Sequence, residues 1–138
     1  MLRNLTISNV VLIERLEIDF RAGLCALTGE TGAGKSILLD SLGLALGARA
    51  ESRLVRKGAD KAVVSASFEI APTHKAYSIL KAAEFATEAG EALILRRSLS
   101  ADGISKAFIN AQPVSVNVLR QVGESLVEIH GQFDPHKL

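Results

Sequence analysis

The sequence predicts a single α/β domain, and three of its features carry that prediction. Apolar and polar residues alternate in two early segments, as in strands with one solvated face. A glycine-rich loop then lies between a short apolar run and a helical pattern, and a β-hairpin pattern follows in the second half of the chain. With 138 residues, 48% of them hydrophobic, the chain can bury a core without a metal or a disulfide.

The composition excludes several classes of protein. Only 3 prolines and a high apolar fraction argue against collagenous and disordered chains. The apolar runs are too short to span a bilayer and the first residues do not resemble a signal peptide, so we expect a cytoplasmic protein with no membrane contact. The net charge of +1 gives no argument for nucleic-acid binding by the chain as a whole. Cys25, the one cysteine, is either a buried inert thiol or a reactive one.

The first elements are two strands that we expect to pair antiparallel, in residues 5–8 and 16–20. Residues 24–28 are apolar on both faces, which is typical of a short strand buried within a sheet. From Lys35 an amphipathic helical pattern begins, and it ends at Gly47. The order is therefore strand, glycine loop, helix.

A second set of elements follows a polar stretch. Residues 62–70 predict a strand, and Pro72 precedes a helix over residues 74–83. Residues 93–99 and 105–109 predict a β-hairpin around the turn Ala101-Asp102-Gly103.

The last elements are a short helix and a strand. Ser115 is the expected N-cap of a helix that ends near Gly123, and residues 126–129 are expected to form a final strand.

Residues 29–36 match the motif G-x-x-x-x-G-K-[ST] without a mismatch. They are Gly29, Glu30, Thr31, Gly32, Ala33, Gly34, Lys35 and Ser36. The glycines let backbone N–H groups approach phosphate oxygens, and the helix that follows adds the positive end of its dipole. Lys35 would contact the β- and γ-phosphates, and the Ser36 hydroxyl would ligate the Mg²⁺ ion that bridges them. Because a buried strand precedes the motif and a helix follows it, the sequence predicts a phosphate-binding loop rather than an empty glycine-rich turn.

Three stretches of the chain resemble one protein family. They are residues 16–38, which contain Leu-Thr-Gly-Glu-Thr-Gly-Ala-Gly-Lys-Ser, residues 95–110, which contain Leu95-Arg96-Arg97 and Ala107-Phe108-Ile109-Asn110, and residues 128–132. They resemble the N-terminal head of the RecN family, DNA double-strand-break repair ATPases related to the SMC proteins. Ile104, where the family has arginine, and the stretch Phe133-Asp134-Pro135-His136 depart from the pattern.

The resemblance implies the N-terminal half of an ABC-type P-loop ATPase head, with a mixed sheet and an antiparallel β-hairpin lobe, which binds ATP and Mg²⁺. Gln132 matches the glutamine of the family's Q-loop, so Lys35 and Gln132 are candidate catalytic residues, and Ser36 and Gln132 are candidate Mg²⁺ ligands. His130, close to Gln132, is either structural or a base.

The resemblance also implies what must complete the site. No ABC signature and no apolar strand ending in Asp-Glu occurs in the sequence, so we expect residues 1–138 to be an N-terminal lobe without the coiled coil and the C-terminal lobe. The implied partners are the C-terminal half of the same head, a second head that engages on ATP binding, and DNA. The implied location is the cytoplasm, in association with the nucleoid.

Residues 49–61, called here the basic segment, are locally cationic. The cations are Arg49, Arg53, Arg56, Lys57 and Lys61, against the anions Glu51 and Asp60. The segment is either a solvated face or a contact with DNA phosphates or a second head. No aromatic residue alternates with the charges, so the segment is not predicted to stack on single-stranded bases.

Two other functions share the phosphate-loop motif. A self-contained small P-loop NTPase or kinase would need its own specificity residues, and the Asn-Lys-x-Asp stretch of guanine recognition does not occur in the sequence. A clamp module would use ATP to hold two heads together with little hydrolysis. Head dimerisation with a slowly hydrolysed ATP analogue would discriminate among these functions.

Overall fold

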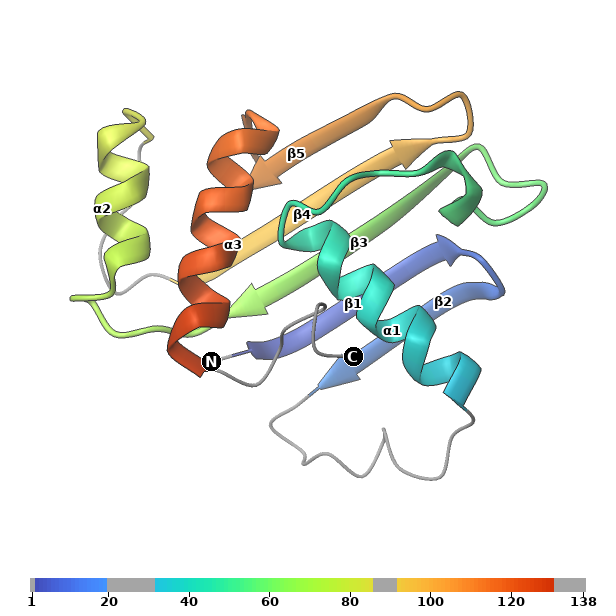
Figure 1. The fold of residues 1–138 in the computed structure, drawn as a ribbon, viewed down its shortest axis with the longest axis horizontal. Coiled ribbons are helices and arrows are strands. Elements are labelled where there is room, and N and C mark those ends of the chain that lie inside the picture. Colours follow the sequence, from blue (N-terminus) through green and yellow to red (C-terminus); the bar gives the residue numbers. More distant parts are fainter. Residues whose placement is uncertain (1, 20–31, 86–91, 131–138) are drawn as a thin grey trace.

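The described chain forms a sheet covered by helices on one face (Figure 1). The computed structural model describes residues 2–19, 32–85 and 92–130, and for residues 32–36 and 127–130 it describes only the backbone. Within these ranges the sheet has six strands in the order β2-β1-β3-β4-β5-β6, and every neighbouring pair is antiparallel. The predicted strand over residues 24–28 lies outside the described residues.

The first hairpin confirms the predicted pairing. β1 (Leu2–Val10) and β2 (Ile13–Asp19) pair with Leu5 opposite Ile18 and Ile7 opposite Leu16, which places the alternating apolar side chains on one face.

β3 (Lys61–Phe68) lies at the centre, paired with β1 on one side and with β4 (Leu93–Ser100) on the other. β4 and β5 (Ser105–Ile109) form the predicted hairpin, in whose turn the Ser100 hydroxyl donates to the Asp102 carboxylate. β6 (Gln112–Val114) completes this edge of the sheet.

Three helices supply the other side of the core. α1 (Gly32–Ala45) packs on β1, β3 and β4, while α3 (Val116–His130) packs on β5. α2 (Lys75–Ala82) packs against α3 and is capped by His74, whose Nδ1 accepts the backbone N–H of Ala76 at 2.9 Å. A short 3₁₀ helix, η3 (Ser52–Leu54), lies within the basic segment. None of the helices among the described residues combines the length and the apolar character needed to cross a membrane.

The predicted helix before Gly123 and the predicted strand over residues 126–129 are wrong as separate elements. Ser115 is the N-cap, as expected, because its Oγ accepts the N–H of Val118 at 3.2 Å, but α3 then continues through Gly123 to His130. Leu119, Val122 and Leu126 are fully buried at the three- and four-residue spacing of one helix face, so packing favours a single helix.

α1 begins at Gly32, three residues before the predicted start at Lys35. Glycine is a weak helix former. Here, however, the first turn continues into a helix that packs on the sheet, so tertiary contacts outweigh the local propensity.

Candidate nucleotide-binding site

The phosphate-loop motif leads directly into α1. Gly32, Ala33, Gly34, Lys35 and Ser36 form the first residues of this helix, whereas Gly29, Glu30, Thr31 and Gln132 lie outside the described residues. The first N–H groups of an α-helix have no partner within the helix and carry partial positive charge, so they can donate to an anion. The described backbone of the motif therefore suits a phosphate group.

α1 is held against the sheet by one apolar face. Leu44 and Ala45 are buried in the core, and Ile37 and Leu38 pack at its edge, while Asp40 is exposed. Ser41 is also fully buried, and its hydroxyl donates to the Ile37 carbonyl one turn earlier at 2.8 Å. The helix thus lies over the central strands with its polar side in solvent.

The C-terminal end of α1 is bound by a buried arginine. Arg97 of β4 is only 3% exposed, and its Nη1 donates to the carbonyl of Leu44 at 3.1 Å and to that of Ala48 at 2.9 Å. Its Nε donates to Ser105 Oγ of β5 at 2.7 Å. One guanidinium group therefore joins the hairpin to the end of the phosphate-loop helix.

A second arginine reaches the same place from α3. Arg120 Nε donates to the Gly47 carbonyl at 3.4 Å. Burial lowers the pKa of Arg97 from its ordinary value, and repulsion by Arg120 lowers it further. The carbonyl groups at the end of α1 carry partial negative charge, which offsets this crowding of cations.

Glycines let α1 and α3 approach at this point. A Cβ on Gly123 would lie 2.3 Å from the carbonyl oxygen of Leu46, and a Cβ on Gly47 would lie 2.5 Å from the Cα of Arg120. Gly47 also has φ +99°, which favours glycine. α3 is thus packed directly against the end of α1, and its last residue, His130, precedes the predicted Gln132 by two positions.

Sequence analysis identified Arg97 only as part of a family motif and did not predict its hydrogen bonds to α1 and β5. Alternation could have revealed them, because a strand with Leu95 and Leu99 facing the core must turn Arg97 inward and Arg96 outward. A buried arginine on an inner strand requires several hydrogen-bond acceptors, so the inward position of Arg97 predicts contacts of this kind.

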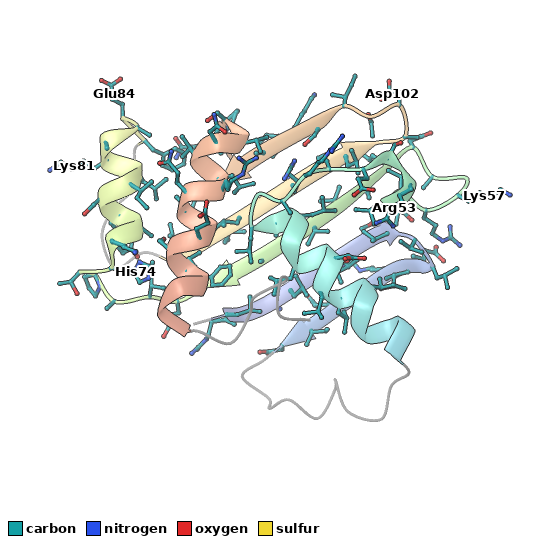
Figure 2. All side chains as sticks on the ribbon, viewed as in Figure 1. Arg53, Lys57, His74, Lys81, Glu84 and Asp102 are labelled. Carbon is teal, nitrogen blue, oxygen red and sulfur yellow. The ribbon has the colours of Figure 1, made fainter. Side chains whose placement is uncertain are left out.

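The basic segment is fixed at its backbone while most of its charges face solvent. Leu54 and Val55 are buried, and the Arg56 N–H donates to the Asn9 carbonyl at 2.8 Å. Arg53 is exposed and pairs with Glu51 at 2.8 Å. Figure 2 shows Arg53 and Lys57 at the end of the sheet that also carries Asp102.

Comparison with known proteins decides the family. A family model described as an AAA domain matches residues 4–135. The chain belongs to the AAA domain family. DNA repair protein RecN of Vibrio cholerae serotype O1 is 45% identical over 138 residues, which are 100% of this chain and 24% of that protein. The chain spans about a quarter of the length of the curated relatives that it matches.

Solved structures show the same fold. One, described as "Structural biochemistry of ATP-driven dimerization and DNA stimulated activation of SMC ATPases", has a TM-score of 0.65 at 18% identity over 99% of this chain and 93% of that chain. An SMC head domain from Thermotoga maritima has a TM-score of 0.57 at 19% identity over 87% of this chain and 41% of that chain. The predicted fold class, a P-loop ATPase head in its N-terminal half, and the predicted resemblance to RecN are both confirmed.

For this AAA-family chain, the metal prediction depends on side chains that are not described. Among the residues whose side chains the structure does describe, no group of three or more His, Cys, Asp or Glu residues could hold a metal ion. The hydroxyl of Ser36 and the amide oxygen of Gln132 are hard oxygen donors of the kind that Mg²⁺ prefers, so both stay candidates by chemistry.

Proposed function

We propose that residues 1–138 are the ATP-binding N-terminal lobe of an SMC-like ATPase head that acts in recombinational repair of DNA double-strand breaks. The observation that carries the proposal is the uninterrupted motif of residues 29–36 leading into α1. The similarity to RecN over the whole chain supports the repair role.

Each motif residue has its own part in the proposed site. The backbone N–H groups of residues 29–34 surround the phosphates, and Lys35 adds a compact positive charge on the β- and γ-phosphates. Ser36 and Gln132 would hold Mg²⁺, which would neutralise phosphate charge. Gln132 also orients the attacking water.

The proposed lobe works with other parts. The structural neighbour described by ATP-driven dimerisation and DNA-stimulated activation supports a second head and DNA as partners. A C-terminal lobe would supply the acidic strand end and the signature loop, with a coiled coil between the two lobes. We also propose a cytoplasmic, nucleoid-associated location without a membrane partner, because the relatives are named as DNA repair proteins.

The experiment that tests this proposal is calorimetric titration of the full-length protein with Mg-ATP. Lys35→Ala removes a charge-assisted contact worth about 1.5–3 kcal/mol, so ATP affinity should fall roughly 10- to 150-fold. Lys81→Ala, an exposed lysine in the last turn of α2, is the matched control and should bind ATP as the wild type does. Equal affinities for the wild type and a folded Lys35→Ala protein would exclude the proposed site.

A further inference from the structure

We propose that Arg97 is a positioning residue for the nucleotide site, which fixes α1 along its own axis and so places the phosphate loop at the opposite end of the helix. The inference rests on the proposed ATP site, because it names the residue that holds that site's helix in place.

The geometry of the guanidinium group supports this role. Its Nη1 bridges two carbonyls, that of Leu44 in the last turn of α1 and that of Ala48 just beyond it, while its Nε is held by Ser105 Oγ. The side chain comes from β4, which is paired on both sides within the sheet. A rigid strand therefore holds the end of α1 through a planar group with fixed donor directions.

The apolar contacts of α1 leave one degree of freedom that Arg97 removes. Packing against the sheet resists lifting the helix, but apolar contact is non-directional and restrains sliding along the axis less strictly. Hydrogen bonds to carbonyls at the helix end are directional, and they fix the axial position. α1 has 14 residues and rises about 1.5 Å per residue, so Gly32 lies about 20 Å from Ala45. A shift of Ala45 along the helix axis would displace Gly32 by a similar distance as the shift itself.

The electrostatics of the site favour a positioning role over a stabilising one. Among the described residues, Arg97 forms no ion pair with a carboxylate, and its hydrogen bonds go only to carbonyl and hydroxyl oxygens. Burying a cation without a carboxylate partner is costly, which argues against net stabilisation as the main role of Arg97. What an apolar side chain of similar length cannot supply is the direction of the bonds to α1.

Arg97 also meets α3 at the same point. Arg120 donates to the Gly47 carbonyl, adjacent to the Ala48 carbonyl that Arg97 binds. The arginine of β4 and the arginine of α3 thus bind adjacent carbonyls just beyond the end of α1.

The test compares two substitutions at Arg97 with one at its neighbour, in the full-length protein. Arg97→Met keeps an unbranched apolar stem but ends where the guanidinium group begins, so it removes every donor, whereas Arg97→Lys keeps the charge and loses the fork. Arg96→Met is the matched control, because Arg96 is exposed on the other face of β4, with its Cζ 5.5 Å from the Phe108 ring centroid. The readouts are the Kd for Mg-ATP, kcat and KM for ATP hydrolysis, the Tm, and amide hydrogen exchange across residues 32–48 without nucleotide.

We expect Arg97→Met to weaken ATP binding by about tenfold, because small displacements of a binding group lose large factors. Amide exchange in α1 should speed up, Arg97→Lys should restore part of both effects, and Arg96→Met should match the wild type. If Arg97→Met does not fold, Arg97→Lys decides the question, with an intermediate loss expected.

Three results would overturn the inference. The first is ATP affinity within about twofold of the wild type in the folded Arg97→Met protein. If Arg97→Met does not fold, the same result in Arg97→Lys overturns the inference. The second is unchanged amide exchange in α1. The third is a loss of ATP affinity that is as large in Arg97→Lys as in Arg97→Met and that follows the fall in Tm alone, because the loss would then reflect stability. If the wild type itself binds no ATP while α1 exchange still depends on Arg97, the proposed function fails and the anchoring of α1 stands.

Discussion

At the scale of single residues, the contact between α1 and α3 depends on the absence of two side chains. Gly47 and Gly123 lie where the backbone of one segment meets the backbone of the other, so neither neighbour can move aside as a flexible side chain would. Gly43, also in α1, differs, because a Cβ there would meet only Ala48 Cβ at an ordinary 3.7 Å. The same substitution should therefore have opposite signs at two helical glycines.

We predict that Gly123→Ala destabilises the chain, while Gly43→Ala stabilises it. The added methyl at Gly123 would clash with Leu46 and force α3 away from α1, at a cost of about 1–3 kcal/mol. At Gly43 the gain in helix propensity, up to about 1 kcal/mol, meets no clash. Urea unfolding of the 138-residue chain measures both, with the wild type as reference. A Gly123→Ala chain as stable as wild type would contradict the close approach of the two segments.

At the scale of elements, the sequence predicts most of the strands and helices because their patterns are local. The β1–β2 hairpin, β3, α2 and the β4–β5 hairpin all follow from alternation, turn residues and caps. The strand predicted over residues 126–129 was wrong because Val127 and Ile129 are β-branched residues, which favour strands when they are read in isolation. Only their continuity with the buried face of residues 119–126, which depends on contact with the sheet, makes them helical.

In the candidate site, too, features within one continuous segment could be predicted, whereas contacts between distant segments could not. The phosphate loop could be proposed from the sequence because one continuous segment contains its whole motif, and it stays a prediction. The anchor of α1 could not, because Arg97 binds carbonyls 53 and 49 positions earlier in the chain, and their place beside β4 exists only in the folded sheet.

Two arginines of the basic segment, Arg53 and Arg56, test whether this segment contacts DNA. If it contacts DNA, Arg53→Gln with Arg56→Gln in the full-length protein should weaken binding at every sequence and flatten the plot of log affinity against log salt by roughly one unit per lost contact. Fluorescence anisotropy with labelled duplexes at several salt concentrations measures the slope. Lys81→Gln, at an exposed position of α2, is the control. An unchanged slope would mean that Arg53 and Arg56 do not contact DNA phosphates.

At the scale of the whole molecule, we propose that the ATP site is divided between two lobes. In-line phosphoryl transfer needs a held metal, a positioned water and charge stabilisation around the γ-phosphate. These 138 residues offer the phosphate loop, Ser36 and Gln132, and no apolar strand ending in Asp-Glu. The RecN relatives are about four times as long as these 138 residues.

We therefore predict that the 138-residue chain alone binds Mg-ATP weakly and does not turn it over. Adding a separately expressed C-terminal half of the head should restore phosphate release, because that half would supply the acidic groups that hold the metal and activate water. The measurement is steady-state phosphate release by each half and by the mixture, with a Lys35→Ala chain in the mixture as the control that must stay inactive. Turnover by the chain alone that Lys35→Ala abolishes would refute the divided site and favour a self-contained P-loop NTPase. Turnover that survives Lys35→Ala would point to a contaminant, since the phosphate loop would then have no part in it.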